Sequence, residues 1–320
     1  MKKSMNIVII LLLVALVLTL SSCKKKTPTA TDPVKDPAES TEDVGGDEVN
    51  REKIMAEFDN ILKSSELNQI VGYIDENIGK LTQIEGDKML SELERALEQS
   101  LDATTDAVLQ GDPNGELMNI AGTESFFPED KIKDIQDEKL RDEITKIMNN
   151  NYKLINVEGS FYPIIDYEKL KKYNNYISDE MKEYIEIKAL DSSEPVAADG
   201  GLRISYDDLA DRILQTEKFI GKYSQGQRYE EMLRNYKNKL VLYLGGLDNT
   251  PIADFKTKKI YDDVLASYNK VAKVKDSATA FVVNKYIDTI KENNLIINKA
   301  VEEKIVSLVN EALSLLEVSK

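Results

Sequence analysis

Apolar side chains recur every three or four residues from about residue 48 onward, which is the spacing of amphipathic helices. The pattern predicts a helix with Ile54, Phe58 and their neighbours on one face. It predicts another helix whose leucines between residues 90 and 108 share a face and which ends at the turn cluster 111–115. Pro128, followed by two acids, is typical of a helix start and predicts a helix that continues to residue 149.

The second half of the chain repeats these signals. Ser178 and Ser205 each precede acidic residues, which predicts two serine-capped helices. Further on, tyrosines and leucines alternate at steps of four and three residues and predict a seam that faces a partner helix: Tyr229, Leu233, Tyr236, Leu240, Tyr243 and Leu247. Thr250-Pro251 is expected to cap the next helix, and the same rhythm over 297–315 predicts the last one.

Strand signals are sparse, and the run 161–165 is short and interrupted by Pro163. We therefore expect a mainly α protein of antiparallel helical bundles, with about ten helices and little or no sheet. All tyrosines except Tyr73 and Tyr286 lie between residues 152 and 268. This shift in composition favours two helical domains, an N-terminal one over 48–155 and a Tyr-rich one over 156–320.

The N-terminus has a different pattern. Two lysines precede an unbroken apolar stretch from Ile7 to Leu18, and small residues follow it up to Cys23. This order is typical of a secretory signal peptide, here residues 1–22. A membrane-spanning helix is the alternative, but it needs about 20 apolar residues, and this stretch is shorter.

The run Leu20-Ser21-Ser22-Cys23 resembles the lipobox of bacterial lipoprotein precursors. The resemblance implies that a diacylglyceryl group is added to the thiol of Cys23, which becomes the new N-terminus. Cys23 is the sole cysteine, so it has no internal disulfide partner, and lipidation accounts for its presence in an exported chain. The implied location is the outer face of the bacterial cytoplasmic membrane.

Residues 23–47 are rich in Lys, Thr, Pro, Asp, Glu and Gly and contain almost nothing apolar, so we expect a disordered tether. Loss of Lys2 and Lys3 with the signal peptide takes the formal charge from −15 to −17. So acidic a chain is a poor partner for nucleic acid and is repelled by anionic headgroups. The simplest reading of the charge is solubility.

The chain contains no histidine, which removes the commonest metal ligand and the usual general base. With Cys23 lipidated, thiol chemistry and zinc, haem-thiolate or iron–sulfur sites lack ligands as well. We therefore expect no cofactor, no metal site and no catalytic residue. Carboxylate-only chemistry survives these exclusions.

Candidate sites remain, each with a simpler alternative. Phe161, Tyr162 and Tyr167 lie in or beside an irregular segment, and Asp248 and Asn249 follow Gly245-Gly246, so these five are the candidate ligand surface. Packing against neighbouring elements explains the same loops. A second set of candidates consists of three acids within one helical turn, for which helix capping is the simpler explanation: Asp207, Asp208 and Asp211.

The stretch 158–167, with 247–251 further on, is similar to a group of uncharacterised lipoproteins from low-GC Gram-positive bacteria. The similarity supports the cell-surface placement and transfers no functional residue. The leading hypothesis is a non-enzymatic, lipid-anchored binding or scaffolding module with a protein or cell-wall partner. The alternatives are a receptor with a tyrosine-lined cleft for a small ligand or cell-wall fragment, and a carboxylate-only hydrolase or lyase of cell-wall glycan.

Overall fold

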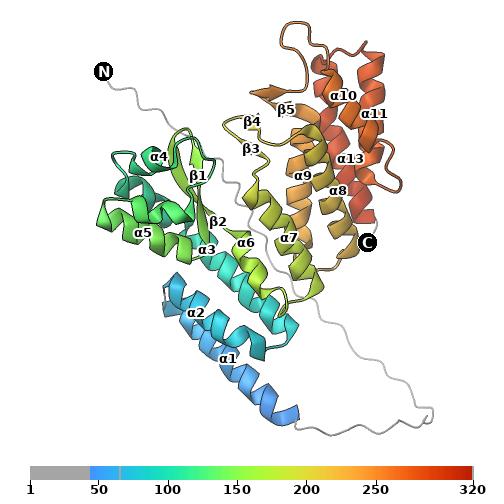
Figure 1. Cartoon of the computed structure of the whole chain (residues 1–320). Helices are drawn as coiled ribbons and strands as arrows, with labels where there is room; N and C mark the ends of the chain where they lie inside the picture. Colours follow the sequence, from blue (N-terminus) through green and yellow to red (C-terminus); the bar gives the residue numbers. More distant parts are fainter. Residues whose placement is uncertain (1–43, 65, 319–320) are drawn as a thin grey trace, which may run out of the picture. The chain divides into compact units, whose positions relative to one another are not determined.

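The computed structural model describes residues 44–64 and 66–318 (Figure 1). The predicted signal peptide, Cys23 and most of the predicted tether lie outside these residues. The chain divides into two units, Met1–Val44 and Gly45–Lys320, and apart from Val44 the described residues belong to the second. Within the described residues the prediction of a mainly α protein is confirmed, with thirteen α-helices and only short two-stranded sheets.

The elements before the first hairpin are α1 (Val44–Ser64), α2 (Leu67–Asn77), α3 (Gln83–Gly111), α4 (Glu116–Ala121) and α5 (Glu138–Asn149), with 3-10 turns at Ile78–Lys80 and Glu129–Asp134. The helices that follow the hairpin are α6 (Tyr167–Leu170), α7 (Asp179–Ser193), α8 (Tyr206–Lys222), α9 (Tyr229–Gly245), α10 (Asp262–Val271), α11 (Ala278–Glu292), α12 (Lys299–Glu302) and α13 (Lys304–Val318), with a 3-10 turn at Lys171–Tyr173. In this second set α9 packs against α8 and α13, and α11 packs against α13 (Figure 1).

The helix starts follow the capping signals of the sequence. The Ser178 hydroxyl accepts a hydrogen bond from the Met181 N–H at the start of α7, and Ser205 forms a capping box with Asp208 at the start of α8. α3 ends at Gly111, and the carboxylate of Asp112 accepts hydrogen bonds from the first N–H groups of α4. The helix end at the expected turn cluster 111–115 and both serine caps are thus confirmed.

Three predicted helix boundaries were wrong. The expected helix over 128–149 is divided, because the Asp137 carboxylate accepts hydrogen bonds from two N–H groups and starts α5 afresh after the 3-10 turn. Thr250-Pro251 caps no helix but forms strand β6 (Thr250–Pro251), which pairs with β5 (Gly246–Leu247). The last expected helix is two helices, α12 and α13, separated at Glu303.

The longest hairpin pairs β1 (Tyr152–Val157) with β2 (Ser160–Ile165). Glu158 and Gly159 between them both have positive φ, as a tight two-residue hairpin turn requires. Pro163 is tolerated in β2 because a two-stranded sheet leaves one side of the strand free of backbone pairing. A third pair, β3 (Ala197–Ala198) with β4 (Gly201–Leu202), lies beside β5.

The predicted border between residues 155 and 156 falls inside β1. Strand β2 packs on α3, and one hydrophobic cluster contains residues from both sides of the border, from Ile54 to Leu316. The division into two helical domains stays a prediction, because this shared packing does not separate the two parts.

The tyrosine seam of α9 faces the interior, as predicted. Tyr229, Tyr236 and Tyr243 are all buried. The Tyr236 hydroxyl lies 2.9 Å from the Thr279 hydroxyl, and the Tyr243 hydroxyl lies 2.9 Å from the Ser267 hydroxyl. Tyr236 and Tyr243 therefore pack the core with their hydroxyl groups hydrogen-bonded. None of the described helices combines the length and the apolar character that a membrane-spanning helix needs.

Candidate functional site

The five candidate residues lie in three separate places. Phe161 is buried on β2, where its ring meets that of Phe127 edge-on at 5.6 Å. Tyr162, the next residue of β2, is half-buried, and Tyr167 is buried at the start of α6.

Asp248 and Asn249 are exposed at the turn between β5 and β6. The Asn249 N–H donates to the carbonyl of Gly200 over 2.8 Å, and its side-chain amide donates to the carbonyl of Asp199. Asn249 therefore joins two hairpins. The structure does not bring Phe161, Tyr162 and Tyr167 together with these two residues.

One of the acids at the start of α8 acts as the capping interpretation expects. Asp208 completes the capping box with Ser205. Asp207 lies 3.1 Å from the Lys270 ammonium, and its pKa is lowered by a hydrogen bond from the Ser267 hydroxyl and by Lys270. Among the described residues no group of three or more Asp, Glu, Cys or His side chains is arranged to hold a metal ion.

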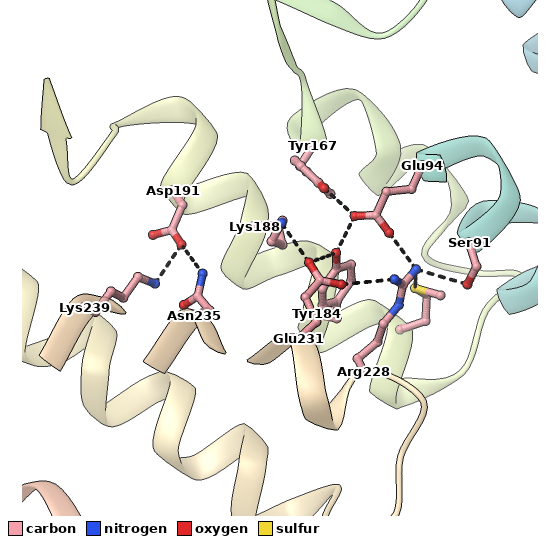
Figure 2. A network of polar contacts seen from close by, with 11 residues as sticks. Ser91, Glu94, Tyr167, Tyr184, Lys188, Asp191, Arg228, Glu231, Asn235 and Lys239 are labelled. Atoms are coloured by element: carbon pink, nitrogen blue, oxygen red, sulfur yellow. Dashed lines mark hydrogen bonds and ion pairs between the residues drawn. The ribbon is translucent and has the colours of Figure 1, made fainter. Parts of the chain in front are cut away.

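A polar network that the sequence did not reveal lies inside the described unit (Figure 2). We call it the interior network; it contains Ser91, Glu94, Tyr167, Tyr184, Lys188, Asp191, Arg228, Glu231, Asn235 and Lys239. Helix α7 supplies Tyr184, Lys188 and Asp191 at steps of four and three residues, so these side chains share one face. Glu231, Asn235 and Lys239 repeat at four-residue steps along α9 and face them.

Arg228, the residue before α9, links α3 to α9. Its guanidinium lies 2.7 Å from Oε2 of Glu94 on α3 and 3.3 Å from Oε2 of Glu231 on α9. The same group donates to the Ser91 hydroxyl at 3.1 Å and stacks 4.3 Å from the centre of the Tyr184 ring. One side chain thus compensates two carboxylates, and planar guanidinium is suited to that task.

Tyr184 stands between the same two carboxylates. Its hydroxyl contacts Glu94 and lies 2.7 Å from Oε1 of Glu231, and the Tyr167 hydroxyl also donates to Glu94. The Lys188 ammonium binds Oε1 of Glu231 at 2.9 Å. Glu94 and Glu231 are therefore balanced by Arg228 and Lys188, and the cluster is close to neutral.

Burial and neighbouring charges shift the pKa values of Glu231 and of the two tyrosines. Burial would raise the pKa of Glu231, but the Lys188 ammonium, the Tyr184 hydroxyl and Arg228 together hold it below its usual value. Burial raises the pKa of Tyr184 and Tyr167 far above the ordinary tyrosine value, and Glu94 raises both further. Both tyrosines are hydrogen-bond donors at neutral pH, and neither is an activated base.

A second part of the network surrounds Asp191. Its carboxylate lies 2.7 Å from the Lys239 ammonium and 3.4 Å from the Arg212 guanidinium, and both cationic residues are 4% exposed. Arg212 also binds the carboxylate of Glu194 at 2.7 Å. Burial lowers the pKa of Lys239, and Asp191 only partly opposes that effect.

The interior network offers no room for a substrate. Two acids that contact one hydroxyl are close enough for a glycosidase pair, but that chemistry also needs space for a sugar ring. The cavity bordered by Glu94, Tyr167, Tyr184 and Arg228 is too small for a water molecule. The arrangement is suited to joining α3, α7 and α9.

Surface grooves offer the space that the network lacks. A groove of about 440 Å³ lies among α2, α3 and α5; it has polar walls and is spanned by the ion pair of Lys146 with Glu66 at 2.9 Å. A groove of about 720 Å³ lies among α8, the 274–278 segment, α11 and α13. We call it the α11 groove. Its apolar lining includes Val274, Phe281 and Leu315, which are 39%, 45% and 37% exposed.

Sequence patterns contained one signal for the interior network. Glu94 falls on the same helical stripe as Leu90, Leu93 and Leu97, and a charge on an apolar stripe points to a buried partner. The partner itself could not be found from the pattern, because Arg228 lies 134 positions further along the chain.

No family model matches the chain, and neither curated proteins nor solved structures give a match. The functional assignment therefore depends on the residues and the geometry described above.

Proposed function

We propose that this chain is a lipid-anchored, extracytoplasmic helical protein that binds or scaffolds a partner and carries no enzymatic activity. Cys23 holds it on the outer face of the bacterial cytoplasmic membrane. Supporting this placement are a basic start, an apolar core, small residues and the sole cysteine, in the order that lipoprotein precursors require. Two acyl chains hold a protein stably, whereas one binds only marginally.

Cys23→Ala tests the anchor. The variant should accumulate as an unprocessed precursor, because the thiol that receives the lipid is missing. Ser21→Ala is the matched control, since it keeps a small residue in the same run and should be processed normally. Fractionation and the apparent mass of each chain measure the difference; normal maturation and membrane retention of the Cys23→Ala chain would contradict the proposal.

The α11 groove is the observation that carries the binding role. It combines apolar walls, half-exposed hydrophobic side chains and a volume of about 720 Å³. Pockets of about 300–1,000 Å³ with mostly apolar walls are typical of binding sites. The buried tyrosines of α9 do not favour the alternative of a tyrosine-lined cleft.

Phe281→Asp tests the groove. Cross-linking in intact cells followed by pull-down should recover one dominant protein partner with the unchanged chain. The amount of partner recovered with the variant should be at least about tenfold lower, because a buried charge is poorly tolerated in an apolar contact. Val306→Asp is the matched control, because Val306 is 69% exposed on α13 and does not line the groove. This variant should recover as much of the protein partner as the unchanged chain.

Both variants change exposed side chains and should fold normally, which urea unfolding checks. Equal recovery of the partner by both variants would show that the groove is not the binding surface. Recovery of glycan or a small molecule in place of a protein would favour the receptor alternative.

A further inference from the structure

Phe255 is the most exposed large hydrophobic residue described, at 81%. It stands in a tight turn between the isolated pair Ala253–Ile260 and is followed by three exposed lysines, Lys256, Lys258 and Lys259. We call residues 253–260 the Phe255 turn. A single exposed hydrophobic residue needs no special explanation in itself, so the shape and charge of the turn around Phe255 decide what it can bind.

The turn is held firmly in shape. The Asp254 carboxylate accepts hydrogen bonds from the N–H groups of Lys256 at 3.0 Å and Thr257 at 2.7 Å, and from the Thr257 hydroxyl at 2.9 Å. The Asp254 N–H donates to the Lys259 carbonyl, and the Lys258 N–H donates to the Asp254 carbonyl, each over 2.9 Å. Lys258 adopts a positive φ of 58°, which tightens the turn. The backbone that carries Phe255 is thus held in one conformation by these hydrogen bonds.

The charge of the turn opposes that of the chain. The whole chain has a formal charge of −15, yet the turn carries three lysines and one aspartate. That aspartate is occupied by the hydrogen bonds of the turn, and the next acids, Asp262 and Asp263, begin α10. The Lys258 ammonium lies 5.0 Å from the centre of the Phe255 ring. The exposed tip is therefore an aromatic ring beside positive charges.

We infer that the Phe255 turn inserts into the headgroup region of an anionic lipid bilayer. The ring of Phe255 lies at the boundary between headgroups and acyl chains, and the lysines contact lipid phosphates. Aromatic rings favour the membrane interface, and lysine stems extend toward phosphates while their ammonium groups stay wet. A stable protein contact buries about 800 Å² on each partner, which a single eight-residue turn does not supply. A bilayer makes no such demand, and anionic lipid complements the lysines.

The inference builds on the proposed anchor at Cys23, which would keep the turn close to a bilayer. It gives the acidic body a preferred orientation, because the turn is attracted to a surface that repels the rest of the chain.

Phe255→Trp provides a direct test, because the chain contains no tryptophan and the new indole is a unique reporter. The mature lipidated chain is purified and reconstituted into vesicles of phosphatidylcholine with or without phosphatidylglycerol. Phe281→Trp is the matched control, since Phe281 is also exposed and also lies beside a lysine, with Lys285 at 4.6 Å. Brominated lipids then measure how close each indole lies to the acyl chains.

In anionic vesicles we expect a blue-shifted emission and bromolipid quenching at least about twofold stronger for Phe255→Trp than for Phe281→Trp. When Lys256→Gln and Lys259→Gln are added to the Phe255→Trp chain, its quenching in anionic vesicles should fall to the level seen in neutral vesicles. Lys258 is left unchanged because of its positive φ.

Equal quenching of the two indoles, or equal quenching in neutral and anionic vesicles, would overturn the inference. A blue shift of the Phe255→Trp emission with polyglutamate but not with lipid would also overturn it, because the turn would then bind an acidic protein. Sedimentation of the chain with vesicles reports the anchor separately, so failure of the anchor and failure of the turn are distinguishable.

Discussion

Replacing Arg228 with alanine should destabilise the folded chain by about 3–5 kcal/mol, the usual cost of removing one partner of a buried ion pair. The side chain of Arg228 is 13% exposed and that of Glu94 is 6% exposed, so solvent screens this pair weakly. Its loss leaves Glu94 with its hydroxyl partners but without its ion pair, and it removes one of the two cations that balance Glu231. Urea unfolding at neutral pH measures the change in the free energy of unfolding.

Arg95→Ala is the matched control, because Arg95 also forms an ion pair, with Glu92, but that pair is exposed. It should cost at most about 1 kcal/mol, as exposed pairs do. Adding Glu94→Gln to Arg228→Ala should restore part of the lost stability, because the stranded carboxylate is then neutral. Equal effects of Arg228→Ala and Arg95→Ala would show that the interior network does not hold the helices together.

Replacing Tyr268 with alanine should cost about 3–5 kcal/mol, as large-to-small changes of buried aromatic residues do. Tyr268 is fully buried, and its ring lies 5.0 Å from that of Tyr243 and 5.9 Å from that of Tyr286. Its hydroxyl donates to the Tyr243 carbonyl at 2.7 Å, near the end of α9 where carbonyls lack helical partners. Tyr268→Phe should therefore cost about 1–3 kcal/mol by leaving that carbonyl unsatisfied.

Tyr261→Ala is the control for this cluster, because Tyr261 is 39% exposed and precedes the same helix, α10. Its loss should change the free energy of unfolding by less than about 1 kcal/mol. Thermal and urea unfolding of the three variants should rank them in that order. A Tyr268→Ala chain as stable as Tyr261→Ala would mean that the tyrosine seam is not part of a packed core.

Local signals in the sequence predicted the helical class and several of its details. Serine followed by acids marked the starts of α7 and α8, because a hydroxyl at that position satisfies an otherwise free N–H group. The four-and-three spacing of alternating tyrosines and leucines marked the buried face of α9. Each of these features depends on residues within a few positions of one another.

Features that depend on competing or distant partners were missed. The helix expected over 128–149 continued through Ile135 in the apolar pattern, but Asp137 offered a better start for α5. Thr250-Pro251 has the composition of a helix cap, yet these residues pair with Gly246-Leu247 as a hairpin directly after α9. The interior network joins Glu94 to Arg228, and no local pattern records such a pairing.

The proposed anchorage at Cys23 is the central claim, and mass spectrometry of the N-terminal peptide of the chain purified from bacterial membranes tests it most directly. We predict a peptide that begins at Cys23, lacks residues 1–22 and carries the added mass of a diacylglyceryl group. An unmodified peptide that runs from Leu18 through Cys23 into Lys24 would contradict the account.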